Sequence, residues 1–264
     1  MENYLESYYR DYDEDGRLES RWGRVKYITT MDCVHRYLRP GMRVMEIGAA
    51  TGRYSHALAR EGYQVDAVEL LAHHIAQFRE RTQPGERVTI TQADARDLSA
   101  FAGDTYDVTL LLGPMYHLYT REDQLRALGE AIRVTRPGGV VCVAYCMSDP
   151  SVLSYGFRRG CLPQLLERGL LDLNTFAAFS DPEDLFQLYR VEDIAALRGH
   201  FPVTPLELVA TDGYANHMRD TLEEMDEDTY RWYLRYHLAT CRRPDMLGYS
   251  HHTLDIFRKE IGTC

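Results

Sequence analysis

One stretch decides the fold: Arg43-Val-Met-Glu-Ile-Gly-Ala-Ala-Thr-Gly-Arg-Tyr-Ser-His-Ala-Leu-Ala-Arg60. It opens with an apolar run, which predicts a short buried strand. Small residues follow from Gly48 to Gly52, and Tyr54 and Leu58 then recur at helical spacing with alanines between them. A strand, a glycine turn and a helix start expose backbone N–H groups at the helix N-terminus. The stretch therefore predicts a ligand-binding turn.

Two acidic residues stand at the ends of successive predicted strands. Glu46 lies beside the glycine turn, where a carboxylate repels a pyrophosphate and favours a ligand that carries positive charge or hydroxyls. Residues 63–70 have the pattern of a second buried strand, which ends in Glu69 one βαβ unit later. An acid at that position can accept hydrogen bonds from ribose hydroxyls.

Together these motifs resemble the class I S-adenosylmethionine-dependent methyltransferases, whose pattern is an acid followed by Gly-x-Gly-x-Gly. Ala50 takes the place of the middle glycine, a departure that is tolerable if its φ stays negative. The resemblance continues through Gln92-Ala-Asp94-Ala95 and residues 111–117, and it covers roughly residues 40–147. It implies S-adenosylmethionine as the cofactor. The cofactor-binding residues it implies are Tyr27, Glu46, Gly48, Ala49, Ala50, Gly52, Tyr54, Glu69, Leu70, Asp94, Ala95, Leu112 and Gly113.

Asp94 has two interpretations. In the family, the acid at this position accepts a hydrogen bond from the adenine amino group. The alternative is that Asp94 caps a short helical turn over residues 95–98.

The remaining apolar runs predict the rest of an α/β fold. Strands are expected at 88–94, 106–112, 140–146, 203–210 and 252–258, with helices at 28–38, 54–60, 72–81, 121–136 and 216–241. Residues 137–139 are expected to end the helix before the fifth strand. The order of these strands and helices along the chain predicts a doubly wound, mostly parallel, seven-stranded sheet of the Rossmann-like methyltransferase type, with only the last strand antiparallel.

Two regions depart from this alternation. Residues 1–40 are expected to form an N-terminal helical lid before a methyltransferase domain at 41–264, because Tyr4, Tyr8 and Tyr12 recur every four residues. The alternative is an amphipathic helix packed on the sheet. Residues 148–200, rich in leucine and phenylalanine, are expected to form a helical insertion after the fifth strand. The resemblance implies that this insertion is a substrate cap.

The loop after the fourth strand faces the methyl group in the family. Here it is Gly113-Pro-Met-Tyr116-His117-Leu118, without the Asn/Asp-Pro-Pro-aromatic motif that grips planar amines, so an exocyclic base nitrogen is an unfavourable acceptor. We interpret Tyr116 and His117 as catalytic, acceptor-side residues, because a histidine titrates near neutral pH. The alternative for His117 is a packed histidine that caps the next segment.

The other histidines give weaker signals. The pairs at 73–74 and 251–252 are expected at the surface or at a strand edge. His217 and His237 lie on the predicted long helix, and spacing alone does not show whether they reach a site.

Composition excludes several classes of function. The chain has 264 residues, a net charge of −10 and no basic cluster, so a nucleic-acid groove is not expected. No run is long and apolar enough for a membrane span, and the acidic N-terminus lacks a signal-peptide core, so we expect a cytoplasmic protein. The six cysteines are expected to be reduced, and none has a zinc-site spacing, so no metal is expected.

The sequence thus favours a methyltransferase that acts on nitrogen or oxygen of a small molecule. A peptide or protein N-methyltransferase and a non-catalytic cofactor-binding protein remain alternatives. A nicotinamide oxidoreductase is disfavoured, because Gly48-x-x-x-Gly52 and Glu46 do not fit its Gly-x-Gly-x-x-Gly turn. The oligomeric state, monomer or homodimer, stays open.

Overall fold

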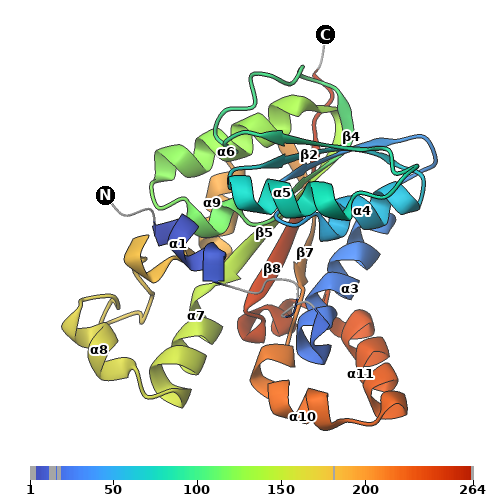
Figure 1. Cartoon of the computed structure of the whole chain (residues 1–264). Helices are drawn as coiled ribbons and strands as arrows, with labels where there is room; N and C mark the ends of the chain where they lie inside the picture. Colours follow the sequence, from blue (N-terminus) through green and yellow to red (C-terminus); the bar gives the residue numbers. More distant parts are fainter. Residues whose placement is uncertain (1–3, 12–15, 17–18, 181, 263–264) are drawn as a thin grey trace. The chain divides into compact units, whose positions relative to one another are not determined.

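The computed structural model describes residues 4–11, 16, 19–180 and 182–262. Eight strands form one sheet with the order β3-β2-β1-β4-β5-β8-β7, and β6 pairs with β5. Strands β2, β4, β5, β7 and β8 are labelled in Figure 1. The strands are β1 Arg43–Ile47, β2 Gln64–Glu69, β3 Val88–Gln92, β4 Tyr106–Leu111, β5 Thr135–Met147, β6 Leu188–Tyr189, β7 Val203–Ala210 and β8 His252–Lys259. The doubly wound α/β prediction is therefore confirmed.

The helices alternate with the strands along the chain. The α-helices are α1 Tyr4–Asp11, α3 Arg21–His35, α4 Arg53–Arg60, α5 Ala72–Arg81, α6 Arg121–Val134, α7 Ser148–Ser151, α8 Leu162–Glu167, α9 Val191–Arg198, α10 Arg219–Glu224 and α11 Glu227–Thr240. The shorter elements are η1 Pro114–His117, the π-helix η2 Val152–Arg158, η3 Pro182–Asp184, η4 Ala215–Met218 and η5 Pro244–Tyr249.

Strand directions follow from the backbone hydrogen bonds. Strand β1 is parallel to β2 and β4, and the ladder continues in parallel to β3 and β5. Strand β8 is antiparallel, because its first residues contact the last residues of its neighbours: Met147 N donates to His251 O over 2.9 Å, and Thr211 N donates to His252 O over 3.0 Å. The carboxyl ends of β5 and β7 therefore lie at the same edge of the sheet.

The chain folds into two compact units, each assembled from separate pieces of sequence. One unit contains residues 33–144, 195–206 and 256–264, and the other contains residues 1–32, 145–194 and 207–255. In the first unit, α4 and α5 pack on β2 and β3, and α6 packs on β4. Buried apolar side chains such as Val44 and Ile47, both at 0% exposure, form its core.

In the second unit, α1 contacts the segment after α8. The hydroxyl of Tyr4 donates to Glu183 Oε1 over 3.4 Å, and the ring of Tyr8 meets that of Phe186 edge-on at 6.0 Å. Tyr12, the third member of the predicted tyrosine face, lies outside the described residues. The lid assignment for residues 1–40 stays a prediction.

The predicted insertion at 148–200 contains mainly short helices, as expected, but it adds one strand. Strand β6 pairs in parallel with the end of β5 through Cys146 and Met147, so the sheet has eight strands instead of seven. A two-residue strand is too short to give an alternating pattern, which explains why the sequence did not reveal it.

Three predicted boundaries were wrong. The helix expected at 216–241 is divided into η4, α10 and α11, because Asp226 begins a new helix and its carboxylate accepts from Thr229 N over 2.9 Å. Helix α6 ends at Val134, so residues 137–139 belong to β5, beside a register shift against β4. The helix expected at 28–38 begins at Arg21.

Candidate functional site

The turn between β1 and α4 is built on two glycines that no other residue can replace without strain. Gly48 has a φ of 81° and Gly52 a φ of 89°, both in the left-handed region. A Cβ at Gly48 would come within 2.4 Å of Pro114 Cδ, and one at Gly52 within 2.4 Å of Phe78. Gly48 N donates to Val68 O over 2.8 Å, which fixes the turn to the end of β2.

Ala50 departs from the expectation that its φ is negative. Its φ is 46°, a conformation that costs a residue with a Cβ roughly 1–3 kcal/mol when the surrounding structure imposes it. The backbone N–H of Ala50 donates to Glu69 Oε2 over 2.9 Å. The turn therefore aims a backbone N–H at the acid of the next strand, and this contact helps to hold the strained conformation.

Glu69 lies at the end of β2 and is 7% exposed. Its second oxygen, Oε1, accepts from Leu70 N over 2.9 Å and from Leu71 N over 2.8 Å. Burial alone would raise the pKa of Glu69, but His74, 3.7 Å away, and the backbone donors of Leu71 and Ala50 outweigh it and hold the pKa below its usual value. The side chain is thus a fixed, charged acceptor.

The acceptor capacity of Glu69 matches a ribose. A carboxylate offers about four lone-pair sites, and backbone N–H groups use three of them. One ribose hydroxyl can bond to Oε2 without displacing any of these donors. A second requires the N–H of Ala50 to give way.

Glu46, at the end of β1, has the opposite electrostatic character. It is 1% exposed, and Ser55 Oγ donates to its Oε2. Burial raises its pKa to about 8, against the lowering effect of the bonds from Ser55. Glu46 is therefore mostly protonated at neutral pH, and a cationic ligand beside it would favour the ionised form.

Asp94 follows β3 and is held by Arg96. The Arg96 guanidinium donates to both carboxylate oxygens, over 3.0 and 2.6 Å, and the backbone N of Arg96 donates to Oδ1 over 2.8 Å. The hydrogen bond from Arg96 holds the pKa of Asp94 below its usual range. The bond to the backbone makes Asp94 a cap of a turn, as the alternative interpretation proposed, but no helix forms at 95–98.

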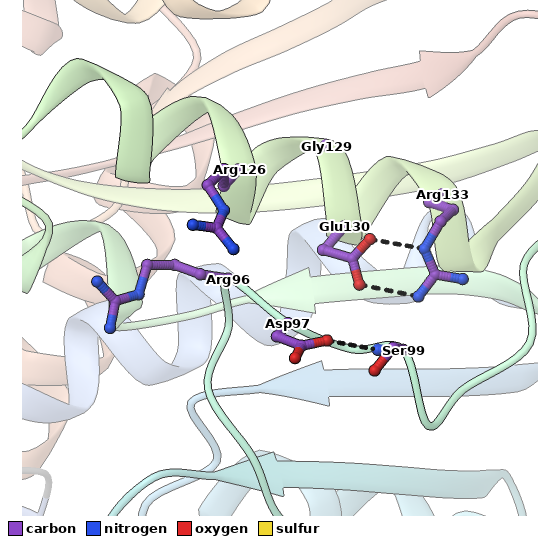
Figure 2. Close-up of a pocket in the computed structure, with 7 residues that line it drawn as sticks. All are labelled: Arg96, Asp97, Ser99, Arg126, Gly129, Glu130 and Arg133. Carbon is purple, nitrogen blue, oxygen red and sulfur yellow. Dashed lines mark hydrogen bonds and ion pairs between the residues drawn. The ribbon is translucent and has the colours of Figure 1, made fainter.

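Beyond Asp94 lies a polar cavity of about 730 Å³ (Figure 2). Its lining residues are Arg96, Asp97, Ser99, Arg126, Gly129, Glu130 and Arg133. Figure 2 shows Arg133 paired with Glu130, and Arg96 pairs with Asp94 and Asp123. The cavity contains none of the predicted cofactor-binding or catalytic residues, so it is not the predicted site.

The loop after β4 lies against the glycine turn. Leu112 N donates to Ile47 O over 3.1 Å, and Gly113 has a φ of 123° at the start of η1. Tyr116 is 7% exposed, and His117 is half-buried with its ring 6.2 Å from that of Tyr116. The structure therefore brings the turn, the end of β2 and this loop together at the carboxyl edge of the sheet.

The remaining predicted cofactor residues differ in environment. Ala49 packs against Ala67 and Phe78 in the core, so it contributes its backbone to the turn. Tyr54 is half-buried in the first turn of α4, Leu70 is 43% exposed and Ala95 is 9% exposed. Tyr27 lies on α3 in the other unit. Their role as cofactor ligands stays a prediction.

Sequence reasoning missed two residues beside the acids, Ser55 and His74. The serine nine residues after Glu46 falls in the first turn of α4, where a helix N-terminal serine is a recognisable signal. His74 was expected at the surface, which is wrong, because it is 4% exposed beside Glu69. Its burial depends on how α5 packs, which spacing does not give.

His251 and His252 were expected at the surface or at a strand edge. Both are half-buried and stand at the start of β8, which lies between β5 and β7 in the sheet. His252 Nδ1 lies 2.6 Å from Asp212 Oδ2, and His251 Nε2 lies 2.9 Å from Ser154 Oγ. His237 is 1% exposed on α11. These contacts join segments far apart in the sequence.

Two kinds of feature are absent from the described residues. No helix in the described ranges is long and apolar enough to cross a membrane. No group of three or more histidine, cysteine, aspartate or glutamate side chains within those ranges is arranged to hold a metal ion.

Comparisons with known proteins agree with this geometry. A family described as "Methyltransferase domain" matches residues 44–139, which contain β1 to the start of β5. The ubiquinone biosynthesis O-methyltransferase of Stutzerimonas stutzeri is 26% identical over 191 residues, which is 70% of this chain and 79% of that protein. The S-adenosyl-L-methionine-dependent Diels-Alderase iccD of Talaromyces variabilis is 29% identical over 106 residues, 39% of this chain and 35% of that protein.

Among solved structures, the CcbJ methyltransferase of Streptomyces caelestis has a TM-score of 0.61 at 14% identity and covers 98% of both chains. At that identity the likeness shows the fold alone. The chain spans 35%, 40% and 46% of the length of three curated relatives that it matches.

The fold has one acid near the end of β1, before the glycine turn, and another at the end of β2, and the matched family model covers this region. Residues 44–139 match a methyltransferase domain, and the comparisons support the assignment of this region to the class I S-adenosylmethionine-dependent methyltransferases.

Proposed function

We propose that this chain transfers a methyl group from S-adenosylmethionine to a nitrogen or oxygen atom of a small molecule. One observation carries the proposal: a hydrogen bond joins the turn after β1 to the acid at the end of β2. Ala50 N donates to Glu69 Oε2 over 2.9 Å. A nucleoside with free ribose hydroxyls fits the fixed acceptor at Glu69.

The second acid supports a cationic ligand. A buried glutamic acid with a pKa of about 8 can lose its proton when positive charge approaches. The ionised form of Glu46 would repel a pyrophosphate and attract a cation, which favours a cationic ligand over a dinucleotide. S-adenosylmethionine carries both a sulfonium and an ammonium group.

When bound, S-adenosylmethionine supplies the methyl group and a neutral sulfur leaving group. The work of the protein is to bind, align and exclude water. Glu69 would accept hydrogen bonds from the ribose, and the turn from Gly48 to Gly52 would lie beside the ligand. Asp94 would accept a hydrogen bond from the adenine amino group. Tyr116 and His117 are proposed on the acceptor side.

A small-molecule acceptor is favoured over a macromolecule. The net charge of −10 gives no electrostatic attraction for nucleic acid. The relative that aligns with 70% of this chain is named an O-methyltransferase of ubiquinone biosynthesis. A peptide or protein N-methyltransferase is the alternative among enzymes.

A second candidate is a protein that binds the cofactor without transferring its methyl group. A relative named a Diels-Alderase that depends on S-adenosyl-L-methionine, 29% identical over 106 residues, supports this candidate. Fold alone does not choose between the two.

Calorimetry and radiolabel transfer separate these candidates. Wild-type protein should bind S-adenosylmethionine and not NAD, and Glu69→Ala should weaken binding by about 1–3 kcal/mol, the cost of losing a hydrogen bond to a charged group. Glu80→Ala, an exposed acid on α5, is the matched control and should bind as wild type. Label from methyl-tritiated S-adenosylmethionine should pass to a small-molecule extract; cofactor binding without transfer would favour the second candidate.

A further inference from the structure

Asp94, the acid proposed to meet the adenine amino group, belongs to a group of three charged side chains inside the unit that contains β1 to β4 and α6. It lies two residues beyond Gln92, which pairs with Glu69 across β3 and β2. Arg96 follows two residues later and stands between Asp94 and Asp123, in the first turn of α6. All three side chains therefore belong to the same unit as the glycine turn.

Arg96 fills most of the acceptor positions of Asp94. Oδ1 of Asp94 accepts from the backbone N of Arg96 over 2.8 Å and from its Nε over 3.0 Å, and Oδ2 accepts from Nη2 over 2.6 Å. A carboxylate offers about four lone-pair sites, two on each oxygen. Three of these sites are occupied, so Asp94 keeps one open acceptor position, which is on Oδ2.

The open position determines which kind of ligand group can bind. The hydrogen bond from Arg96 holds the pKa of Asp94 below its usual value, so the carboxylate is ionised at neutral pH and can only accept. One N–H group of a ligand can bond to Oδ2, whereas a carbonyl oxygen or a phosphate would meet a negative charge there. The amino group of adenine is such a donor, and hypoxanthine has a carbonyl oxygen in its place.

A contribution to folding stability explains little of this arrangement. The side chains of Asp94 and Arg96 are 30% and 39% exposed, and ion pairs that are this accessible to solvent stabilise a fold only slightly. Holding an exposed carboxylate in one rotamer also costs conformational entropy. A ligand that binds a carboxylate already held in place avoids this ordering cost at the moment of binding. The contact is therefore better suited to preparing Asp94 for a ligand.

Asp123 holds the other side of the Arg96 guanidinium. Its Oδ2 lies 3.1 Å from Arg96 Nη1, and its backbone N donates to Thr120 Oγ1 over 3.2 Å at the start of α6. The guanidinium thus has a carboxylate on each side, one after β3 and one on α6. Two carboxylates and one guanidinium leave a net negative charge, which again favours a ligand donor over an anion.

We propose that Arg96 is a positioning residue for nucleobase selection, which holds the Asp94 carboxylate so that Oδ2 accepts from the amino group of adenine. This rests on the proposed function. The site would select a 6-aminopurine over a 6-oxopurine. Because Arg96 acts through Asp94, its effect on selection should vanish in a protein that lacks the Asp94 carboxylate.

Calorimetry on the full chain tests this with two probes, S-adenosyl-L-homocysteine and S-inosyl-L-homocysteine. The second probe has a carbonyl oxygen where the first has the amino group, and neither has a methyl group to transfer, so binding is measured without turnover. The preference is the ratio of the two dissociation constants. Wild-type protein should prefer the adenosyl probe about 10–100-fold, because the inosyl probe loses a hydrogen bond to a charged group.

The arginine variants test the role of Arg96. Arg96→Ala should reduce the preference to about 3-fold or less, mainly by weakening binding of the adenosyl probe, because the charged acceptor is no longer held in place. Arg96→Lys keeps the charge but not the two-pronged contact, so its preference should be intermediate. In an Asp94→Ala background, Arg96→Ala should change the preference no further.

Arg126→Gln is the matched control. The charge of Arg126 also lowers the pKa of Asp94, but no hydrogen bond joins the two side chains in the described part of the chain. This variant should keep the wild-type preference. A loss as large as that of Arg96→Ala would show that nearby positive charge, and not the fixed geometry, is responsible, and would overturn the proposal.

Asp123→Asn separates positioning from a purely structural link between Arg96 and α6. It weakens that link and leaves the three bonds between Arg96 and Asp94 in place. We expect a preference within about 2-fold of wild type, since the partly exposed pair to Asp123 contributes little. If Asp123→Asn loses the preference as Arg96→Ala does, the link to α6 is what matters and the proposal fails. Melting temperatures identify any loss of fold, and Arg96→Lys decides if Arg96→Ala does not fold.

The outcomes distinguish this proposal from the proposed function. Wild-type protein that binds neither probe nor S-adenosylmethionine refutes the proposed function, and the role of Arg96 with it. Wild-type protein that binds both probes equally well leaves the proposed function standing and overturns only the selection by Asp94 and Arg96. An Arg96→Ala protein that keeps the full preference overturns the role of Arg96 alone.

Discussion

Replacing Glu46 by glutamine should stabilise the protein at neutral and alkaline pH. The buried acid has a pKa of about 8, against 4.5 for an ordinary glutamate, so the folded protein retains a proton that the unfolded chain releases above about pH 4.5. The stability contributed by this proton is therefore complete below pH 4.5 and is lost as the pH rises through 8. Glutamine has nearly the same shape, never ionises and keeps an oxygen for Ser55.

The expected gain in stability follows from the pKa of Glu46 in the folded protein and in the unfolded chain. At 1.36 kcal/mol per unit, the penalty that glutamine removes is about 3 kcal/mol at pH 7 and about 5 kcal/mol at pH 9. For a chain of this length each kcal/mol corresponds to about 2 °C in melting temperature. Thermal unfolding followed by circular dichroism at pH 4.5, 7 and 9 should show a gain that grows with pH.

Glu69→Gln is the matched control, because Glu69 ends the neighbouring strand but has a lowered pKa. A carboxylate whose pKa is lower in the folded protein stabilises the fold at pH values above its pKa in the unfolded chain. This variant should therefore lose stability at pH 7 and regain wild-type behaviour as the pH falls. In addition, the NH₂ group of the introduced glutamine would face backbone N–H groups that now donate to Glu69, and two donors cannot bond to each other. If Glu46→Gln shows no gain between pH 4.5 and 9, or the two variants respond alike, the assigned protonation of Glu46 is wrong.

Three further predictions follow from single residues. Ala50→Gly should raise the free energy of unfolding by about 1 kcal/mol in urea melts, because glycine adopts a φ of 46° without strain; a loss of stability would contradict this. Asp226→Ala should cost about 1 kcal/mol in the same assay by removing the N-cap of α11, and Asp228→Ala, in the first turn of the same helix, is its control. His117→Ala should raise the Michaelis constant of the acceptor and leave S-adenosylmethionine affinity intact in calorimetry; lost cofactor binding would place His117 in the cofactor site instead.

Local sequence determined the glycine turn between β1 and α4 and most of the sheet. Val44, Met45 and Ile47 are buried as the apolar run predicted, and β7 spans the predicted 203–210. These features depend on residues near in sequence: strand periodicity, glycines at positive φ and an acid at the end of a strand. The family resemblance rests on the same short motifs.

The tertiary structure decided what depends on distant residues. The protonated state of Glu46 comes from its burial, and the positive φ of Ala50 accompanies its bond to Glu69, nineteen positions away. Ser154 and His251 meet because β5 and β8 are neighbours, although 97 residues separate them. Spacing along the chain carries no information on such contacts, since burial, charge and hydrogen bonding act through space. The sequence therefore predicted the strand and the glycine turn that carry the proposed cofactor residues, and only the packing of the strands revealed the histidine contacts.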